Sequence, residues 1–453
     1  MQVGLELATK RLLSPMRRLL CKLLFFLCLP VAMAMPQTPA LPSGYNYDEA
    51  KVPAYALLDP LRADGQAITT AKAWERHRAE LIRAFETNVY GETPQAARTL
   101  PLHFRVLEHD TPAMSGLAMR RQVLIPLTPA GEAGAAMHLL LYLPARARGA
   151  VPVILGLNFQ GNASVANDPG ILASAVWQAA AERGASPQKV DFPADKRGAQ
   201  ASEWQVKMLL RRGYGLATVY YGDIEPDFKN VTGAGVRAYY QPPTDPKNEQ
   251  WGALGAWAWG LSRALDYLRT DAKIDSDEIV VTGHSRLGKA ADWAAAQDTR
   301  FAALLSTESG KGGQSLYRRD FGETIAHLER SFPYWLCPEF AQWVAHDSEI
   351  PVDGNLLLAL VAPRPLYVAS AEQDLFSDPR GEFLAALDVG KVYALFGKRG
   401  LETGSMPAVN QPVMHDVAYH IRSGVHDVTA FDWEQYLNFL DQHFGSPLTR
   451  RRR

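Results

Sequence analysis

The chain has 453 residues, of which 47% are hydrophobic and 21% are charged, and its formal net charge is −1 at pH 7. This composition is typical of a globular protein with a large core, and it excludes the disordered and fibrous classes. Charges of both signs are spread along the chain, so no basic stripe indicates a nucleic-acid partner and no acidic block indicates a solvated tail.

The first 34 residues have the pattern of a secretory signal peptide. Arg17, Arg18 and Lys22 precede an apolar run at residues 23–32, and Ala-Met-Ala at residues 32–34 matches a cleavage site with small residues. A membrane anchor is the alternative, but the run has about half of the roughly 20 residues that a spanning helix needs. We therefore expect an exported protein, periplasmic or secreted, with no membrane attachment after cleavage.

Cysteine and histidine usage argues against a metal site. Cys21 and Cys28 lie inside the expected signal, which leaves Cys337 alone among apolar neighbours, where we expect it to be buried. After cleavage, neither an intrachain disulfide nor a cysteine-type metal site could form. The histidines lack the H-E-x-x-H spacing of a zinc hydrolase. We expect no metal and no other cofactor.

The remainder of the chain divides into three parts by composition. Residues 35–53 are rich in Pro and Ala and are expected to form a linker or an N-terminal strap. Residues 54–447 carry the helix and strand patterns and are expected to form a single domain, and residues 448–453 form a basic tail. We expect the protein to be a monomer.

The element patterns predict an α/β protein. Helical spacing of apolar residues appears at 71–88, and segments that favour strands follow at 102–107, 120–125 and 138–143. This alternation of strands and helices predicts a doubly wound, mostly parallel sheet with flanking helices. The later apolar runs of strand length, separated by helix-like segments, lie at residues 151–157, 214–220, 278–281, 302–305 and 366–369.

Residues 278–289, EIVVTGHSRLGK, contain the sharpest local signal. They run from an apolar strand through a tight turn into a strong helix former, which is the nucleophile elbow of the α/β-hydrolase fold. Ser285 would then be the nucleophile, and the backbone N–H of Arg286 would donate to the developing oxyanion. The G-x-S-x-G pattern is incomplete, because Leu287 stands where the second glycine is expected. The alternative is a helix-capping serine without chemistry.

A histidine to act as base should follow the acid in chain order. His426 lies in a short loop between the expected strand 417–421 and the helical segment 431–444, where this fold places its base. The competing histidines are His415, His420 and His443.

Two acids are candidates to orient the histidine, and the sequence does not choose between them. Asp374 follows the strand at 366–369 after a few loop residues, and Glu308 follows the strand after the elbow helix. Both lie just beyond the ends of parallel strands, where active sites of open α/β sheets collect. Either could instead cap a helix or join an ion pair.

Several motifs in register resemble the bacterial glucuronoyl esterases of Carbohydrate Esterase family fifteen. Those enzymes cleave the ester between a 4-O-methyl-glucuronic acid branch of xylan and an alcohol of lignin. The resemblance covers residue 151 to the C-terminus. Its motifs are GHSRLGK at 283–289, ESGKGG at 308–313, APRPL at 362–366, AEQDLFSDPRGE at 371–382 and GVH at 424–426.

The resemblance implies a role for each catalytic position. The family's nucleophile falls on Ser285 and its base on His426. The acid positions used by different members fall on Glu308 and Asp374, so this chain keeps both. The arginine after the serine, Arg286, would support the oxyanion.

The resemblance also implies the residues that bind substrate. Lys289, one helical turn after the serine, and Glu323 would contact hydroxyls of the sugar. Phe376 stands where the family commonly has a tryptophan that touches the uronate, so the indole N–H donor is lost and the preference for a 4-O-methyl-glucuronoyl group is left open. His284 replaces a cysteine of fungal members.

Other functions remain possible on these residues. The same triad could serve an acetyl or feruloyl esterase of plant polysaccharide, or a peptidase. A carbohydrate-binding protein with an inactive hydrolase fold is the alternative outside the enzymes, but the retention of the serine, the histidine and both acids favours catalysis. We expect Trp251, Trp257 and Trp259 to pack in the core and not to form a sugar platform.

Overall fold

The computed structural model describes residues 41–180, 185–229, 231, 233–241 and 251–449. The expected signal peptide and residues 450–453 of the basic tail lie outside these ranges. From Leu41 onward the chain forms one compact unit. No helix within the described ranges is long and apolar enough to cross a membrane.

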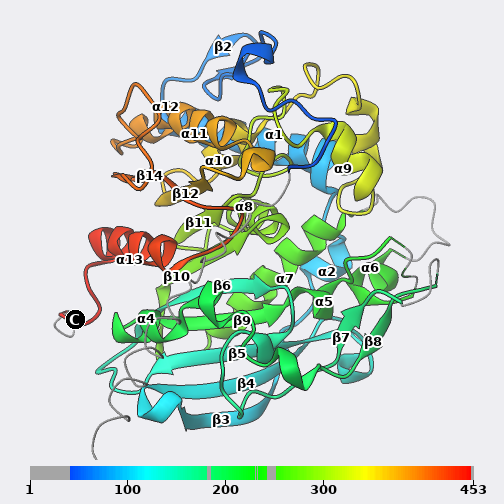
Figure 1. The fold of residues 1–453 in the computed structure, drawn as a ribbon, viewed down its shortest axis with the longest axis vertical. Coiled ribbons are helices and arrows are strands. Elements are labelled where there is room, and N and C mark those ends of the chain that lie inside the picture. The colour runs from blue at the N-terminus through cyan, green and yellow to red at the C-terminus, as the bar shows by residue number, and fades with distance from the viewer. Residues whose placement is uncertain (1–40, 181–184, 230, 232, 242–250, 450–453) are drawn as a thin grey trace, which may run out of the picture. The chain divides into compact units, whose positions relative to one another are not determined.

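A ten-stranded mixed sheet runs through this unit, in the order β13-β14-β12-β11-β10-β6-β9-β5-β4-β3. The six strands from β14 to β9 are parallel to their neighbours, and the outer strands at both edges pair antiparallel. The α/β prediction with a mostly parallel sheet is confirmed (Figure 1). The strands are β3 (Arg105–Ala113), β4 (Ala118–Pro126), β5 (Ala136–Pro144), β6 (Val151–Asn158), β9 (Gly215–Tyr220), β10 (Ile274–His284), β11 (Ala303–Thr307), β12 (Leu366–Ala371), β13 (Val413–Met414) and β14 (Val417–Arg422).

Two of the predicted strands depart most from their expected bounds. β3 begins at Arg105 and runs to Ala113, beyond the predicted end at residue 107, and shifts in its pairing with β4 break the alternation that marks a strand in sequence. β10 begins at Ile274, before the predicted start at residue 278. Ile274 already pairs with β6, and a register shift separates this pair from the apolar stretch on which the prediction was based. Both extensions depend on pairing with a neighbouring strand, which the local sequence pattern does not show.

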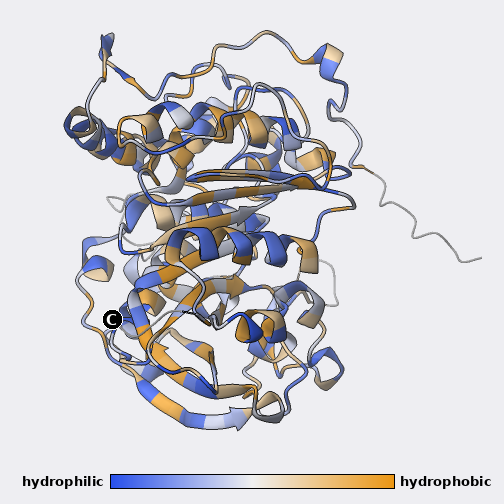
Figure 2. Cartoon of the chain, turned by 90° about the vertical axis from the view of Figure 1, so that its left-hand side faces the viewer, coloured by the Kyte–Doolittle hydropathy of each residue, from blue (hydrophilic) through white to orange (hydrophobic). Residues whose placement is uncertain are grey.

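Helices cover both faces of the sheet and bury two separate cores. The larger core lies under α1 (Ala71–Phe85), α7 (Ala253–Leu268), α8 (Arg286–Gln297), α10 (Gly354–Ala359) and α11 (Pro379–Asp388). The smaller core lies under α4 (Val206–Arg211) and α13 (Ala430–Phe444). Figure 2 shows the matching hydropathy, with apolar strands inside and polar helix faces outside. Parallel strands that are buried on both faces have continuous apolar sequences, and this explains the apolar runs in the chain.

Shorter elements complete the described chain. The predicted helix at 71–88 ends as α1 at Phe85 and continues as one wider turn, Glu86–Tyr90. The remaining short helices are α2 (Gln95–Arg98), α3 (Ala201–Trp204), α5 (Tyr221–Ile224), α6 (Gly235–Tyr240), α9 (Ile325–Ser331) and α12 (Gly390–Ala394). Two small hairpins pair β1 (Arg62–Ala63) with β2 (Gln66–Ala67), and β7 (Val176–Gln178) with β8 (Gln188–Val190).

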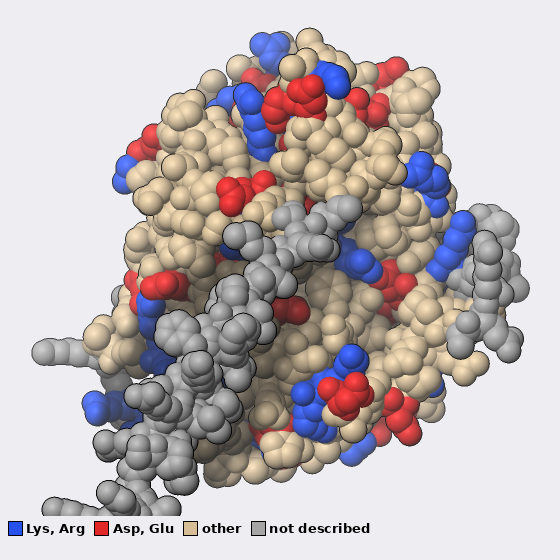
Figure 3. Space-filling view, viewed as in Figure 1, with Lys and Arg blue, Asp and Glu red and all other residues tan. Residues whose placement is uncertain are grey.

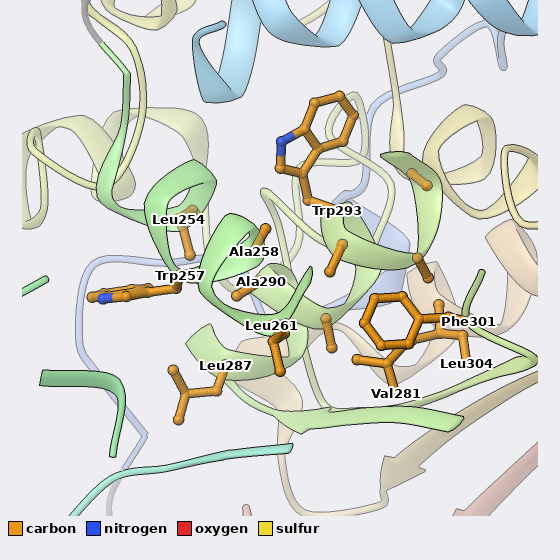
Figure 4. Packing of buried hydrophobic residues seen from close by; sticks show 14 of the residues in the cluster. Leu254, Trp257, Ala258, Leu261, Val281, Leu287, Ala290, Trp293, Phe301 and Leu304 are labelled. Carbon is orange, nitrogen blue, oxygen red and sulfur yellow. The ribbon is translucent and has the colours of Figure 1, made fainter. Parts of the chain in front are cut away.

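The tightest packing surrounds the helix that follows the expected elbow. Figure 4 shows α7 and α8 side by side, with Trp257 and Trp293 among the aliphatic residues that fill the space around them. Trp251 and Trp257 have no exposed surface and Trp259 has 7%, so the prediction that these tryptophans pack in the core is confirmed. Cys337 is also buried, as expected. The elbow helix is therefore held by rigid packing.

Candidate active site

Ser285 lies on the turn between β10 and α8, at the carboxyl end of the parallel strands. Its backbone has φ 58° and ψ −132°, a conformation that costs a residue with a side chain about 1–3 kcal/mol and that is found at functional turns. A Cβ atom on Gly283 would lie 2.1 Å from the carbonyl oxygen of Leu287, so only glycine fits there. Leu287 itself is buried in the core, so the incomplete motif still forms the elbow.

His426 lies in the loop after β14, where two carboxylates approach the same ring nitrogen. Its Nδ1 is 2.6 Å from Asp374 Oδ2 and 3.1 Å from Glu308 Oε2. Both acids that the sequence left as alternatives therefore reach the histidine. Burial alone would lower the pKa of His426, but the hydrogen bonds and charges of the two carboxylates raise it to about 10.

The two acids are held differently. Glu308 is buried, and its carboxylate accepts hydrogen bonds from the Arg422 guanidinium at 2.8 Å and from the Asp427 backbone N–H at 2.9 Å. Asp374 has a lowered pKa, because the hydrogen bond and charge of His426 outweigh the effect of burial. Asp374 is therefore ionised at neutral pH, and Glu308 is fixed in place by groups other than the histidine.

A second histidine that the sequence did not single out as a site residue joins this group. His284 Nε2 is 3.2 Å from Glu308 Oε2, and its ring centre is 4.4 Å from that of His426. Burial, and then the neighbouring His426, lower the pKa of His284. Ligand atoms of His284, Glu308 and His426 lie within 4.8 Å of one another, a spacing that could also hold a metal ion. Hydrogen bonds already join these three residues, so their arrangement does not require an ion.

The side chain of Arg286 pairs with an acid that the sequence did not identify. Its Nη1 is 2.5 Å from Asp227 Oδ2, and its guanidinium lies 5.0 Å from the ring centre of Trp335. Burial opposes the charge, but Asp227 raises the pKa of Arg286 above its usual value. The buried Nε–H of Arg286 has no hydrogen-bond partner among the described residues. Asp227 lies a few residues beyond the end of β9. This position beyond a parallel strand could have identified Asp227 as a candidate site residue in the sequence.

Comparison with known proteins agrees with this geometry. A sequence model of the fungal glucuronyl esterases matches residues 214–397. A carbohydrate esterase from an unknown prokaryotic organism is 44% identical over 90% of this chain and 94% of its own length. The chain belongs to the glucuronoyl esterase family, Carbohydrate Esterase family 15. The resemblance seen in the sequence is thereby confirmed.

Solved structures of family members share the fold. A glucuronoyl esterase from Solibacter usitatus is 46% identical, with a TM-score of 0.82 over 88% of this chain and all of that one. An esterase of family 15 from a marine bacterial metagenome, described as promiscuous, is 43% identical with a TM-score of 0.80, and the match covers 88% of this chain and all of that one. The α/β-hydrolase prediction is confirmed.

In this family member Lys289 and Glu323 form a buried pair beneath the elbow. Lys289 Nζ is 2.9 Å from Glu323 Oε2 and also donates to the backbone carbonyls of Ser309 and Lys311, each at 2.5 Å. The two side chains are 4% and 9% exposed. The structure therefore rules out a freely solvated lysine on the helix surface. Any sugar hydroxyl would meet a preformed ion pair whose charges already compensate each other.

Phe376 lies in the turn after Asp374, and its backbone carbonyl accepts a hydrogen bond from Glu323 N at 2.8 Å. Its ring makes edge contacts with Tyr45 and with His327 of α9, at centre distances of 5.3 Å and 5.1 Å. We call Tyr45, His327, Phe376 and Phe332 the aromatic wall. The sequence did not identify Tyr45 or His327, which carry no local motif.

The N-terminal strap is fixed beside this wall. The carbonyl of Asn46 accepts a hydrogen bond from Gly322 N at 2.8 Å, and the Asn46 side chain donates to the carbonyl of Asp320 at 2.8 Å. Glu49 pairs with Arg319 and, at 3.2 Å, with Arg380. The described part of the strap is therefore an element that supports the site.

Positive and negative side chains are interspersed on the face shown in Figure 3.

Proposed function

We propose that this protein is a serine esterase that hydrolyses the ester between (4-O-methyl-)glucuronic acid of glucuronoxylan and a lignin-type alcohol. Family membership supports the reaction class. The single observation that carries the proposal is His426, whose Nδ1 faces two carboxylates and whose ring lies 4.4 Å from that of His284, the residue before the elbow serine. The substrate is one neutral ester, and no cofactor is required for its hydrolysis.

The reaction would proceed by two acyl transfers. His426 Nε2 takes the proton of Ser285 as the hydroxyl oxygen attacks the ester carbonyl carbon. The tetrahedral intermediate collapses, the alcohol leaves with the proton from His426, and an acyl-enzyme remains. Water then attacks that ester with His426 again as base, which frees the uronic acid and restores the serine.

Two groups would stabilise the oxyanion. The backbone N–H of Arg286 opens helix α8, where the positive end of the helix dipole lies. The Arg286 guanidinium remains charged through Asp227, and its unpartnered buried Nε–H is a donor that a developing negative charge would satisfy. A preorganised donor of this kind is worth about 3–4 kcal/mol of transition-state stabilisation.

The two acids would act together on the base. Asp374, at the shorter distance, holds the proton on Nδ1 and so leaves Nε2 free for the serine. Glu308 adds a second negative charge that stabilises the imidazolium formed in the reaction. Because both raise the pKa of His426, the free enzyme must lose a proton from that ring before it can act as a base.

Lys289, Glu323 and Phe376 would bind the sugar. The three N–H groups of Lys289 already donate to Glu323, Ser309 and Lys311, so a sugar hydroxyl would share one of these donors. Glu323 offers a charged acceptor, and charge-assisted hydrogen bonds are stronger than neutral ones. Phe376 offers an apolar edge without an N–H donor.

The test is hydrolysis of benzyl glucuronate by purified protein that begins at Met35, beside the Ser285→Ala variant and an acetyl ester of similar size. Activity on the uronate ester that is lost in the variant supports the proposal. Activity on the acetyl ester alone would retain the triad and refute the uronate substrate. Inactivity on both would favour a carbohydrate-binding protein.

A broader esterase is the second candidate. A relative of 43% identity is described as promiscuous, and Phe376 removes one polar contact to the acyl group. On this alternative the acetyl ester, or a feruloyl ester, is turned over at a rate comparable with that of the uronate ester.

We further propose that the protein is exported through its N-terminal signal and that it acts as a monomer with a single domain. The sequence pattern of residues 1–34 supports export, and the compact unit that starts at Leu41 supports one domain. N-terminal sequencing of protein recovered outside the cytoplasm would find a start at Met35. Protein in a membrane fraction that retains the apolar run at residues 23–32 would refute the signal and favour the anchor.

A further inference from the structure

We propose that His327, with its tautomer fixed by Tyr45 of the strap, is a sugar-binding residue that presents an Nε2–H donor to a hydroxyl of the uronate. This inference rests on the proposed function and adds to it a donor that Phe376 does not supply. Tyr45 is a positioning residue, because it acts on the sugar only through His327.

The hydrogen-bond chain defines where the protons lie. Arg330 Nη2 is 2.7 Å from the Tyr45 hydroxyl oxygen, and a guanidinium can only donate. The Tyr45 oxygen is also 2.5 Å from His327 Nδ1. We assign the Tyr45 hydroxyl, which already accepts from Arg330, as the donor to Nδ1, because the reverse arrangement would leave the hydroxyl proton without an acceptor among the described residues. A neutral His327 must then carry its hydrogen on Nε2.

The surroundings keep that ring neutral. Burial lowers the pKa of His327, although the carboxylate of Glu323 opposes this shift. The cations of Arg330 and Lys289 lower the pKa further. With Nδ1 occupied by the Tyr45 proton, protonation would also have to break the hydrogen bond at that atom. At pH 7 the ring is therefore a neutral imidazole with one directed donor.

A chain of side-chain contacts links the His327 ring to Arg286, the residue that follows the proposed nucleophile. His327 packs edge-on against Phe376 at 5.1 Å and against Phe332 at 5.9 Å, and Phe332 stacks on Trp335 at 3.8 Å. Arg286 lies over that Trp335 ring. The aromatic wall, continued by Trp335, thus links the strap to Arg286. Among the described residues, no hydrogen bond occupies His327 Nε2, and it is not among their buried unpartnered atoms.

The experiment compares KM and kcat of two variants on benzyl glucuronate and on 4-nitrophenyl acetate, which has no sugar hydroxyls. His327→Phe keeps an aromatic ring but removes the donor, and we expect its KM for the uronate ester to rise about five- to tenfold, the size of one lost hydrogen bond, with kcat within twofold. His327→Gln restores a donor and should recover part of this loss. KM for the acetate ester should not change.

The matched control is His346→Gln, because His346 has a 57% exposed side chain and pairs only locally with Glu349. It should leave both KM values at the wild-type level. Tyr45→Phe keeps the ring contact with Phe376 and removes only the hydroxyl, and it should raise KM for the uronate ester about threefold, as expected for loss of an indirect contact.

A spectroscopic measurement separates positioning from general support. In protein labelled with 15N-histidine, the His327 signal, assigned by its absence in His327→Gln, should show the Nε2–H tautomer in the wild type and a mixture of tautomers in Tyr45→Phe. An Nδ1–H tautomer in the wild type would overturn the inference. An unchanged KM in His327→Phe, or equal losses on both esters, would also overturn it. If the wild type hydrolyses no uronate ester, the proposed function fails and the sugar-binding role fails with it.

Discussion

The two sides of the active site are built in different ways. On the catalytic side Ser285, His426 and the two acids sit on short loops at the ends of neighbouring parallel strands, each fixed by its own strand. On the sugar side the aromatic wall joins α9, a helix of seven residues, to the N-terminal strap, and only Phe376 of the wall follows a strand of the sheet, in the turn after Asp374. On the proposed function, strand ends would position the catalytic residues, whereas loops and the strap would shape the sugar side.

This difference can be tested by substitutions on each side. Changes on the catalytic side should reduce kcat, and changes on the sugar side should raise KM with little effect on kcat.

Ser285→Ala should have the largest effect. Without the nucleophile the acyl-enzyme cannot form, and we expect kcat on benzyl glucuronate to fall on the order of 10⁴- to 10⁶-fold. Alanine keeps the Cβ atom and therefore the positive φ strain, so the thermal unfolding temperature should stay close to that of the wild type. Steady-state kinetics and calorimetry check both, and a variant that keeps a tenth of wild-type activity would exclude Ser285 as the nucleophile.

The two acids should differ in effect. Asp374→Asn removes the shorter hydrogen bond and allows the wrong tautomer of His426, so kcat should fall about 10³- to 10⁴-fold. Glu308→Gln retains a carbonyl acceptor for Arg422 and should cost about 10- to 100-fold. Single-turnover kinetics of both variants give the ranking. The reverse order would make Glu308 the main acid.

The pH profile should shift when one carboxylate is lost. Since Asp374 and Glu308 together raise the pKa of His426 to about 10, kcat/KM of the wild type should rise with pH toward that value. Glu308→Gln removes one cause of the rise, so the acid limb of the profile should move to lower pH. Conversely, protonated His426 stabilises the fold fully below its unfolded pKa of about 6.5, and this contribution is lost as pH rises toward 10. An unshifted limb in the variant would show that Glu308 does not act on the base.

The smallest effect should come from the strap. Glu49→Gln weakens the pairs with Arg319 and Arg380, and since the Glu49 side chain is 41% exposed, we expect a cost of about 0.5–1 kcal/mol. If the strap supports the sugar side, KM for the uronate ester should rise two- to threefold, with kcat and acetate hydrolysis unchanged. An equal loss on both esters would show that the strap supports the whole fold and not the sugar side.

The sequence alone determined the features that are local in the chain. The strand, turn and helix of residues 278–289 identified Ser285 because the elbow needs only consecutive residues, with Gly283 forced by a contact to a carbonyl four residues away. The chain order of the fold then led to His426, Glu308 and Asp374, because parallel strands bring successive loops to one edge of the sheet.

Only the tertiary structure decided the contacts between distant residues. It brought both acids to one ring nitrogen, paired Arg286 with Asp227, and joined Tyr45 to His327 across 282 positions. Neither Asp227 nor Tyr45 stands in a motif, since each contacts a partner that is distant in the sequence. Side-chain pairs of this kind depend on packing in three dimensions, which the periodicity of a sequence does not encode.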